Sequence, residues 1–232
     1  MSTETANRST TRRSFLLTAG VTLVATGKAA AQDNEKAEES AVTPVEDMMR
    51  EHGVLERMLL IYEEGIRRLE TGVEIKPAHL HETASLVQKF IGQYHEVHEE
   101  ESVFPKFREA NVMTDLVEVL ENQHEGGRRV TQEIIRRTSG GTIDDPAKVA
   151  RLMQSYIRMY NPHSAREDTV LFPEFPKLMS PEEYEKLGEE FEEKEEEVFA
   201  NGGFKVVLAR IVEVEKALSI HDLSQFTPKI QA

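Results

Sequence analysis

Apolar residues recur at intervals of three and four from Pro44 onward, which is the spacing of one face of an α-helix. Alternation with a period of two, the pattern of a half-buried strand, is nearly absent. Four successive segments carry the helical pattern, at about 44–71, 77–105, 115–137 and 146–172. Their lengths and short connections predict an all-α fold, an up-down four-helix bundle over residues 44–178.

Two further helices are expected in an extension that covers residues 179–232. Ser180 suits an N-cap and Pro181 suits the first helical turn, so a helix should begin there and continue through a Glu-rich stretch to Phe199. After a glycine-containing break, the amphipathic segment Phe204–Leu218 should form the second helix and pack on the bundle.

Residues 1–31 have the composition of a cleavable export signal. Arg12 and Arg13 precede a mildly apolar run that is too short to span a bilayer, and small residues follow at 29–31. The pattern resembles a twin-arginine signal; the alternative is a disordered basic tail. The resemblance implies the twin-arginine translocase as a partner, a periplasmic or extracytoplasmic location, and export of a folded protein that often already holds its cofactor. The polar residues 32–43 are expected to form a flexible linker.

The composition limits the chemistry that the chain can perform. It has no cysteine, which excludes disulfides, thiolate metal sites, a cysteine nucleophile and a lipoprotein anchor. No stable membrane anchor is therefore expected after the signal is cleaved. Removing residues 1–31 takes away four of the 28 basic residues and one of the 42 acidic ones, so the net charge changes from −14 to −17. Such an acidic chain argues against nucleic acid as a partner.

Two segments of the chain match each other without a gap. The first runs from His95 through Glu99 to Phe-Pro-Lys-Phe, and the second runs from His163 through Glu167 to Phe-Pro-Glu-Phe. A histidine and a glutamate four residues apart share one helix face, so both can reach a single point inside a bundle. One such pair is weak evidence in an acidic helix, whereas two pairs in the same context indicate a site.

The alignment of the two segments also selects among neighbouring residues. His98 aligns with Arg166 and is interpreted as a boundary or solvated residue, because only His95 and Glu99 have chemically equivalent partners. Glu100 aligns with Asp168 and is interpreted as a solvated carboxylate near the rim of the site.

The other two bundle helices each carry one histidine on the apolar face, His52 and His124. A lone histidine there is usually a core residue, but four inward histidines with two glutamates form a metal-binding set. Imidazoles and carboxylates suit a pair of ions such as iron or manganese. Two cations would also offset the cost of burying two carboxylates in a bundle core.

The order His, His-x-x-x-Glu, His, His-x-x-x-Glu, with Phe-Pro after each glutamate, resembles a hemerythrin-like domain of the HHE cation-binding type. The resemblance covers about residues 42–177. It implies two non-haem iron ions, with manganese as the alternative, and two histidines for each metal. The ligand set that it implies is His52, His95, Glu99, His124, His163 and Glu167, with the two glutamates bridging the metals.

The sequence departs from the oxygen carriers of this family. Their fifth histidine follows the one on the third helix by four residues, where this chain has Arg128. They usually have an aspartate five residues after the last histidine, whereas Glu167 follows His163 by four. The chain is more similar to the bacterial branch with four histidines and two glutamates. Fewer protein ligands leave more open coordination positions, which favours redox reactivity over oxygen storage.

The expected function is binding of iron and of a small diatomic ligand, oxygen or nitric oxide, with redox activity as a further expectation. Two alternatives stay open. The first is an enzyme, such as a ferroxidase, a protein that reduces peroxide or nitric oxide, or an iron-repair donor; it would need an electron donor that the sequence does not identify. The second is a non-catalytic protein that buffers metal or binds a partner.

Other polar and aromatic residues are assigned structural roles. Glu56 follows His52 by four residues but lacks the Phe-Pro context, so it is interpreted as solvated or as a neighbour of the ligands. Tyr156 and Tyr160 are expected to pack in the core, with lining of a ligand pocket as the alternative. The run Glu189–Glu197 is interpreted as a solvated helix face rather than a cation-loading patch.

Overall fold

The computed structural model describes residues 42–199 and 203–229, and all regular structure within these ranges is helical. The chain divides into two units, Met1–Ser40 and Ala41–Ala232. The first unit lies outside the described residues, and so does the twin-arginine signal that the sequence predicts. None of the described helices is long and apolar enough to cross a membrane.

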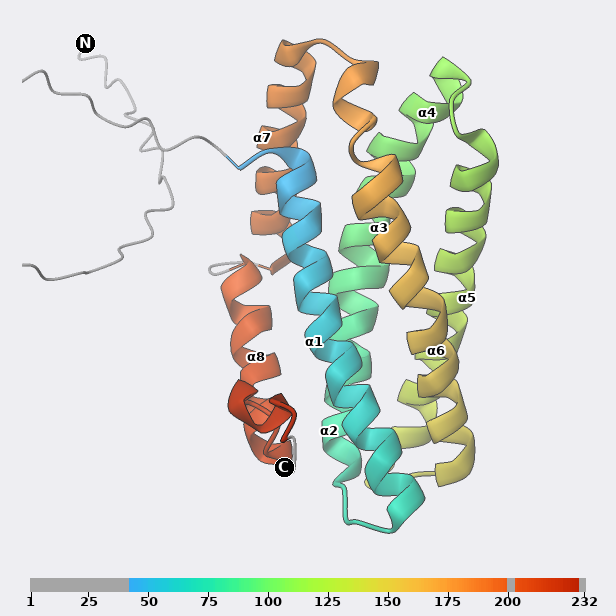
Figure 1. Ribbon diagram of the computed structural model, residues 1–232, viewed down its shortest axis with the longest axis vertical. Coiled ribbons are helices and arrows are strands. Elements are labelled where there is room, and N and C mark those ends of the chain that lie inside the picture. The colour runs from blue at the N-terminus through green and yellow to red at the C-terminus, as the bar shows by residue number, and fades with distance from the viewer. Residues whose placement is uncertain (1–41, 200–202, 230–232) are drawn as a thin grey trace, which may run out of the picture. The chain divides into compact units, whose positions relative to one another are not determined.

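Four helical arms run side by side and form the bundle that the sequence predicted (Figure 1). The first is α1 and the third is α5, whereas the second and fourth arms change helix type along their length. The bounds are α1 Pro44–Thr71; α2 Pro77–Leu86, η1 Val87–His95, α3 Glu96–His98, η2 Glu99–Val103 and α4 Phe104–Ala110; α5 Thr114–Thr138; and α6 Pro146–Arg166 with η3 Glu167–Leu171. The segments η1, η2 and η3 are π-helical.

Local capping explains where the first arm begins and ends. The Glu46 amide donates to the Thr43 hydroxyl, and the Glu46 carboxylate accepts from the Thr43 amide, which makes a capping box before Pro44. At the other end Gly72 has φ 72°, a left-handed conformation that glycine adopts without steric cost.

The second arm continues beyond the point where the sequence predicted its end. Pro105 was expected to stop this helix, but α4 extends through it to Ala110. A proline lacks the N–H for a helical hydrogen bond and clashes with the carbonyl four residues back. The wider π-helical turn of η2, which directly precedes Phe104, accommodates the proline without ending the helix.

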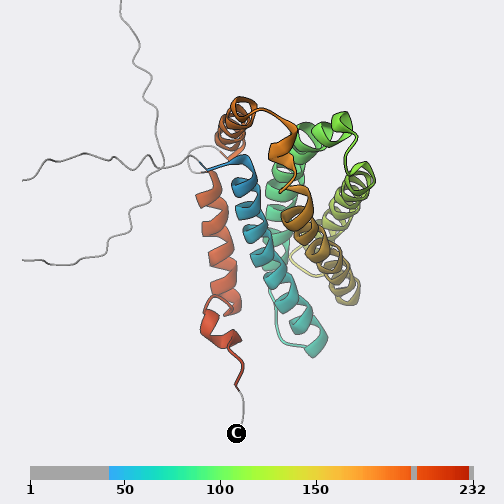
Figure 2. The same ribbon diagram turned by 45° about the horizontal axis from the view of Figure 1, so that its top comes forward.

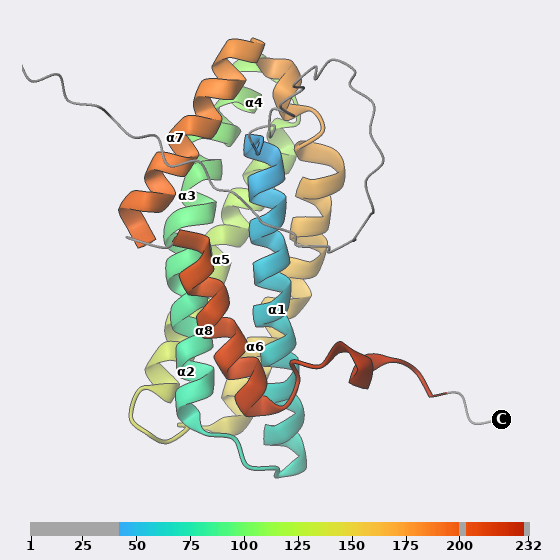
Figure 3. The same cartoon turned by 90° about the vertical axis from the view of Figure 1, so that its left-hand side faces the viewer.

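Two C-terminal helices pack on the bundle, α7 (Pro181–Phe199) and α8 (Gly203–Leu218), followed by the short 3-10 helix η5 (Leu223–Phe226). Figures 2 and 3 show α8 along the flank of α1, and Figure 3 shows it crossing α2. Arg57 on α1 donates two hydrogen bonds to the Glu215 carboxylate on α8, at 2.8 and 2.5 Å. The described helices therefore confirm the all-α bundle with two additional C-terminal helices.

The apolar core consists of two clusters, and polar residues lie between them on every arm. On α1, Met48 belongs to one cluster and Val54 to the other, with His52 between them. On α5, Leu120 and Ile134 have the corresponding places on either side of His124. The fold therefore places one polar layer across the middle of a dry bundle, where unpaired charge is costly.

Candidate metal centre

All six residues that the sequence singled out lie in this polar layer, and each is at most 3% exposed. Each glutamate carboxylate faces one histidine of its own arm and one of another arm. Glu99 lies 3.6 Å from Nε2 of His95 and 3.3 Å from Nε2 of His124. Glu167 lies 3.2 Å from Nε2 of His163 and 3.4 Å from Nε2 of His52.

The histidines form two pairs around these carboxylates. The rings of His52 and His95 have centroids 4.7 Å apart, and those of His124 and His163 have centroids 5.0 Å apart. His52 and His95 have donor atoms close enough to Glu99 to share one ion with it. His124 and His163 form a second such group with Glu99 and Glu167. The two groups of donor atoms therefore lie next to each other, at the residues that the resemblance implied as ligands.

The chemistry of the donor atoms fits a metal centre. Nε2 of His52 and His95 and both carboxylate oxygens of Glu99 and Glu167 are buried, and none has a hydrogen-bond partner among the described residues. Buried polar atoms without partners are rare in proteins, and an ion is one of the few explanations. Imidazole nitrogen and carboxylate oxygen are the donors that iron and manganese accept.

Each glutamate begins a π-helical turn. The Phe104 amide donates to the Glu99 carbonyl, and the Phe172 amide donates to the Glu167 carbonyl at 2.9 Å, five residues back in both cases. Such turns occur frequently at functional sites. The residue after each amide is a proline, which cannot continue the normal ladder, so the Phe-Pro pair accounts for the wide turn on which each glutamate lies.

The phenylalanines of the repeated motif hold the histidine rings. Phe172 stacks on His52 with ring centroids 5.6 Å apart, and Phe104 stacks on His124 at 5.5 Å. The second phenylalanines of the motif, Phe107 and Phe175, stack on each other at 6.2 Å. Equivalent phenylalanines of the two repeated segments therefore pack against equivalent neighbours in the structure.

A shell of hydrogen-bond acceptors orients all four histidines. The residue after each glutamate accepts from Nδ1 of a histidine on another arm: Glu100 from His124 at 2.9 Å, and Asp168 from His52 at 2.7 Å. A histidine whose Nδ1 donates in this way presents Nε2 to a metal.

The residues that precede His52 and His124 in the sequence supply the other two hydrogen-bond acceptors. Glu51 accepts from Nδ1 of His95 at 2.7 Å, and the Gln123 side-chain oxygen accepts from Nδ1 of His163 at 2.9 Å. Sequence reasoning missed these residues, and it wrongly interpreted Glu100 as a solvated carboxylate. Neighbours in a helix point about 100° apart, so spacing rules give no reason to group them with the ligands. Glu51 directly precedes His52 and Gln123 directly precedes His124, and this adjacency to a candidate ligand was the signal available in the sequence.

His98 is buried, not solvated, and the interpretation of it as a boundary residue was wrong. Its ring stacks on Phe191 of α7 with centroids 4.2 Å apart and lies 4.5 Å from the Tyr94 ring. Helix α7 also supplies the one buried carboxylate of the Glu-rich run, Glu195, which accepts from the Phe204 amide at 2.7 Å. The other glutamates of that run are exposed as expected, whereas Phe191 within it is buried.

Burial and neighbouring charges shift the pKa values of the site. Burial raises the pKa of Glu51 to about 8 and lowers that of His95 to about 4. Burial also opposes protonation of His52, but hydrogen bonds to Asp168 and Glu167 outweigh it and raise its pKa to about 10.

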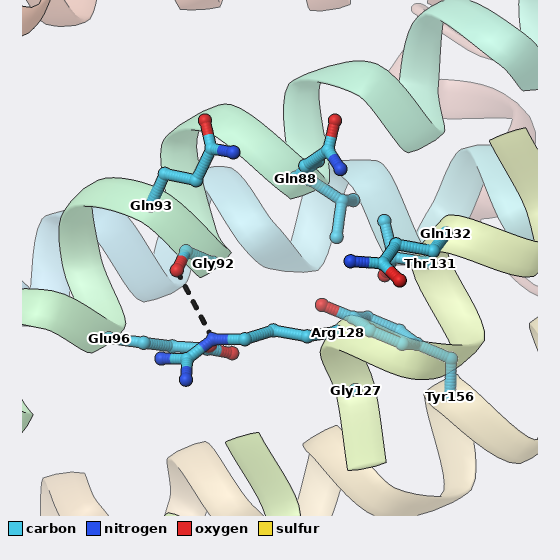
Figure 4. A pocket seen from close by; sticks show the side chains of 10 residues that line it. Gln88, Gly92, Gln93, Glu96, Gly127, Arg128, Thr131, Gln132 and Tyr156 are labelled. Atoms are coloured by element: carbon cyan, nitrogen blue, oxygen red, sulfur yellow. Dashed lines mark hydrogen bonds and ion pairs between the residues drawn. The ribbon is translucent and has the colours of Figure 1, made fainter. Parts of the chain in front are cut away.

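Arg128, at the position of the fifth histidine in the oxygen carriers, pairs with carboxylates of the second arm. Its guanidinium lies 2.8 Å from Glu96 and 2.6 Å from Glu100, and it donates to the Gly92 carbonyl (Figure 4). It also lines a cavity of about 70 Å³ between η1 and α5. Tyr160 donates to the other oxygen of Glu96, and its ring centroid lies 4.9 Å from that of His163.

The tyrosines lie in the core, as the sequence favoured. Tyr156 and Tyr160 are each 1% exposed and stack on each other with centroids 4.6 Å apart. Tyr156 also lines the cavity beside Arg128 (Figure 4), and the alternative that it lines a ligand pocket stays a prediction. Glu56 is exposed and forms no part of the donor set.

Comparisons with known proteins indicate a cation-binding domain over the bundle. Residues 43–175 match the family model described as Hemerythrin HHE cation binding domain. The chain is 45% identical over 199 residues to the uncharacterized proteins Rv1995 and MT2051 of two Mycobacterium tuberculosis strains and to Mb2018 of Mycobacterium bovis. These alignments cover 84% of this chain and 78% of each relative. No solved structure matches the chain significantly.

Proposed function

The chain belongs to the hemerythrin HHE cation-binding domain family, and we propose that it is a non-haem diiron protein that binds a small diatomic ligand. The observation that carries this proposal is the pair of buried carboxylates, Glu99 and Glu167, each between Nε2 atoms of two different arms. Two cations between them would compensate charges that are otherwise costly in a bundle core.

The residues present determine what such a centre offers. Four imidazoles and two shared carboxylates are fewer ligands than two six-coordinate ions accept, so open positions remain. Bound iron would supply those positions and redox chemistry to oxygen or nitric oxide. The protein excludes water with the two apolar clusters on either side of the layer and fixes each imidazole through its Nδ1 partner.

Iron is preferred here over manganese because of the family resemblance, whereas the donor atoms suit both ions. An enzymatic role, as a ferroxidase or in reduction of peroxide or nitric oxide, needs an electron donor and is the alternative. Export through the twin-arginine translocase to a periplasmic or extracytoplasmic location, with metal loaded beforehand, is part of the proposal and rests on residues 1–31.

Optical spectroscopy of the reduced, iron-loaded protein tests the proposed ligand. Exposure to oxygen, and in a separate sample to nitric oxide, should produce a new absorption band that reverses when the gas is removed. A band that forms and decays without reversal would indicate turnover and favour the enzymatic alternative. Unchanged spectra with both gases would contradict binding of a diatomic ligand.

A further inference from the structure

The acceptors behind the four histidines differ in charge, although the ligands themselves are matched. In the pair His52 and His95, both Nδ1 atoms face carboxylates, Asp168 and Glu51, each at 2.7 Å. No lysine or arginine forms an ion pair with either carboxylate among the residues that the structure describes.

The pair His124 and His163 has weaker acceptors. Nδ1 of His163 faces the neutral amide oxygen of Gln123 at 2.9 Å. Nδ1 of His124 faces Glu100, but the same Glu100 oxygen accepts from the Arg128 guanidinium at 2.6 Å. Arg128, which also pairs with Glu96, therefore competes with His124 for the one carboxylate that accepts from this histidine pair among the described residues.

The charge of the acceptor changes how well an imidazole binds a metal. A carboxylate behind Nδ1 raises the basicity of the ring, and loss of such a partner typically lowers metal affinity by about 10- to 100-fold. A neutral amide or an arginine-paired carboxylate gives less of this effect.

We propose that the two metal positions are inequivalent, and that the His52/His95 position binds a divalent cation more tightly than the His124/His163 position. This inference rests on the proposed function, because it assumes that the layer binds two metal ions. The His124/His163 position then fills last and releases its ion first.

The cavity in Figure 4 is lined by residues that contact neighbours of this second position. Its lining includes Arg128, which pairs with Glu100, and Glu96, which accepts from Tyr160 beside His163. Gly92 and Gly127 line it from the two facing helices. Arg128 is only half-buried, so water can approach it from the surface.

Titration of the metal-depleted, full-length protein with Co²⁺ tests the proposal, with the visible absorption of the bound ion as the readout. Two successive binding phases are expected, with dissociation constants that differ by at least about tenfold. His163→Ala should keep the tighter phase and lose the weaker, and His95→Ala should do the reverse.

Substitution of the acceptors assigns the cause. Asp168→Asn should weaken the tighter phase by about tenfold or more, and Gln123→Glu should tighten the weaker phase by a similar factor. Glu101→Gln, which changes an exposed carboxylate in the same helical arm as Glu100, is the matched control and should shift neither phase. Far-UV circular dichroism checks that each variant keeps its fold, and Asp168→Asn alone suffices if Gln123→Glu does not fold.

Two ions of equal affinity in the unsubstituted protein, or an Asp168→Asn variant that weakens only the weaker phase, would overturn the inequivalence and leave the diiron proposal standing. The proposed function fails separately if Co²⁺ binding is absent, or if it is unchanged in both His95→Ala and His163→Ala.

Discussion

Glu100 accepts a hydrogen bond from His124 across the bundle at 2.9 Å, and this contact has a counterpart in the other half of the chain. There Asp168 accepts from His52 at 2.7 Å. Each repeated motif thus provides a glutamate that faces the interior of the site and, one residue later, a carboxylate that holds a histidine of another arm. The two halves of the bundle orient each other's histidines.

His98 lies in the same helical arm as His95 but packs against Phe191 instead of the metal layer. His98→Leu should keep full metal content, because the ring contributes packing and no ligand. Its effect on the free energy of unfolding should stay below about 1.5 kcal/mol, as for other volume-conserving core changes. Metal analysis and chemical denaturation check both values. Loss of metal from a folded His98→Leu variant would mean that the ligand register is wrong.

Much of the fold could be predicted from the sequence. The helical period and the capping residues determined the four arms, and Pro181 and Gly72 lie where the chain begins and ends helices. The helix through Pro105 was not predictable in this way, because proline normally ends a helix and only the wide turn before it removes the clash.

The site was predictable only in part. His52 and His124 were found as single histidines on apolar faces, and the repeat identified the other four inward residues, since histidine and glutamate four apart share a face. It could not identify Glu51 or Gln123, which reach histidines on other arms and depend on how the helices are rotated in the bundle. The burial of His98 depends on α7, an element outside the repeat.

Two adjacent glycines on α5 should respond oppositely to alanine. A Cβ at Gly127 would lie 3.1 Å from both Met159 and Tyr160, and the Tyr160 ring cannot move away from Tyr156 and His163. Gly127→Ala should therefore lower the free energy of unfolding by about 1–3 kcal/mol, as overpacking does. At Gly126 the nearest atom is 3.8 Å away, so Gly126→Ala should raise it by about 0.5–1 kcal/mol through helix propensity. Equal effects of the two substitutions in thermal or urea denaturation would contradict this packing.

The ion pair between Arg57 and Glu215 joins α1 to α8 and should contribute to stability. Arg57→Ala leaves the Glu215 carboxylate, which is 5% exposed, without its bidentate partner, and should cost about 1–3 kcal/mol. Arg136→Ala removes an exposed pair with Glu133 and should change the free energy of unfolding much less. A comparison of urea midpoints measures the difference, and a cost for Arg57→Ala no larger than for Arg136→Ala would show that α8 is not held by this pair.

Export should depend on the arginine pair at positions 12 and 13. Replacement of both arginines by lysine keeps the charge of the segment but removes the twin-arginine pattern, so the protein should stay in the cytoplasm at its unprocessed size. Cell fractionation with size analysis measures this, and Arg8→Lys is the matched control that should be exported normally. Unchanged export of the double variant would remove the twin-arginine assignment.

Iron content of the full-length protein, purified after expression with iron available, tests the central claim most directly. The account predicts about two iron ions per chain in the unsubstituted protein and in His221→Ala, whose histidine is exposed and outside the site. Both His95→Ala and His163→Ala should fall well below two ions per chain while keeping their helical content. Unsubstituted protein with native helicity but no bound metal, or His95→Ala and His163→Ala variants that load as fully as His221→Ala, would contradict it.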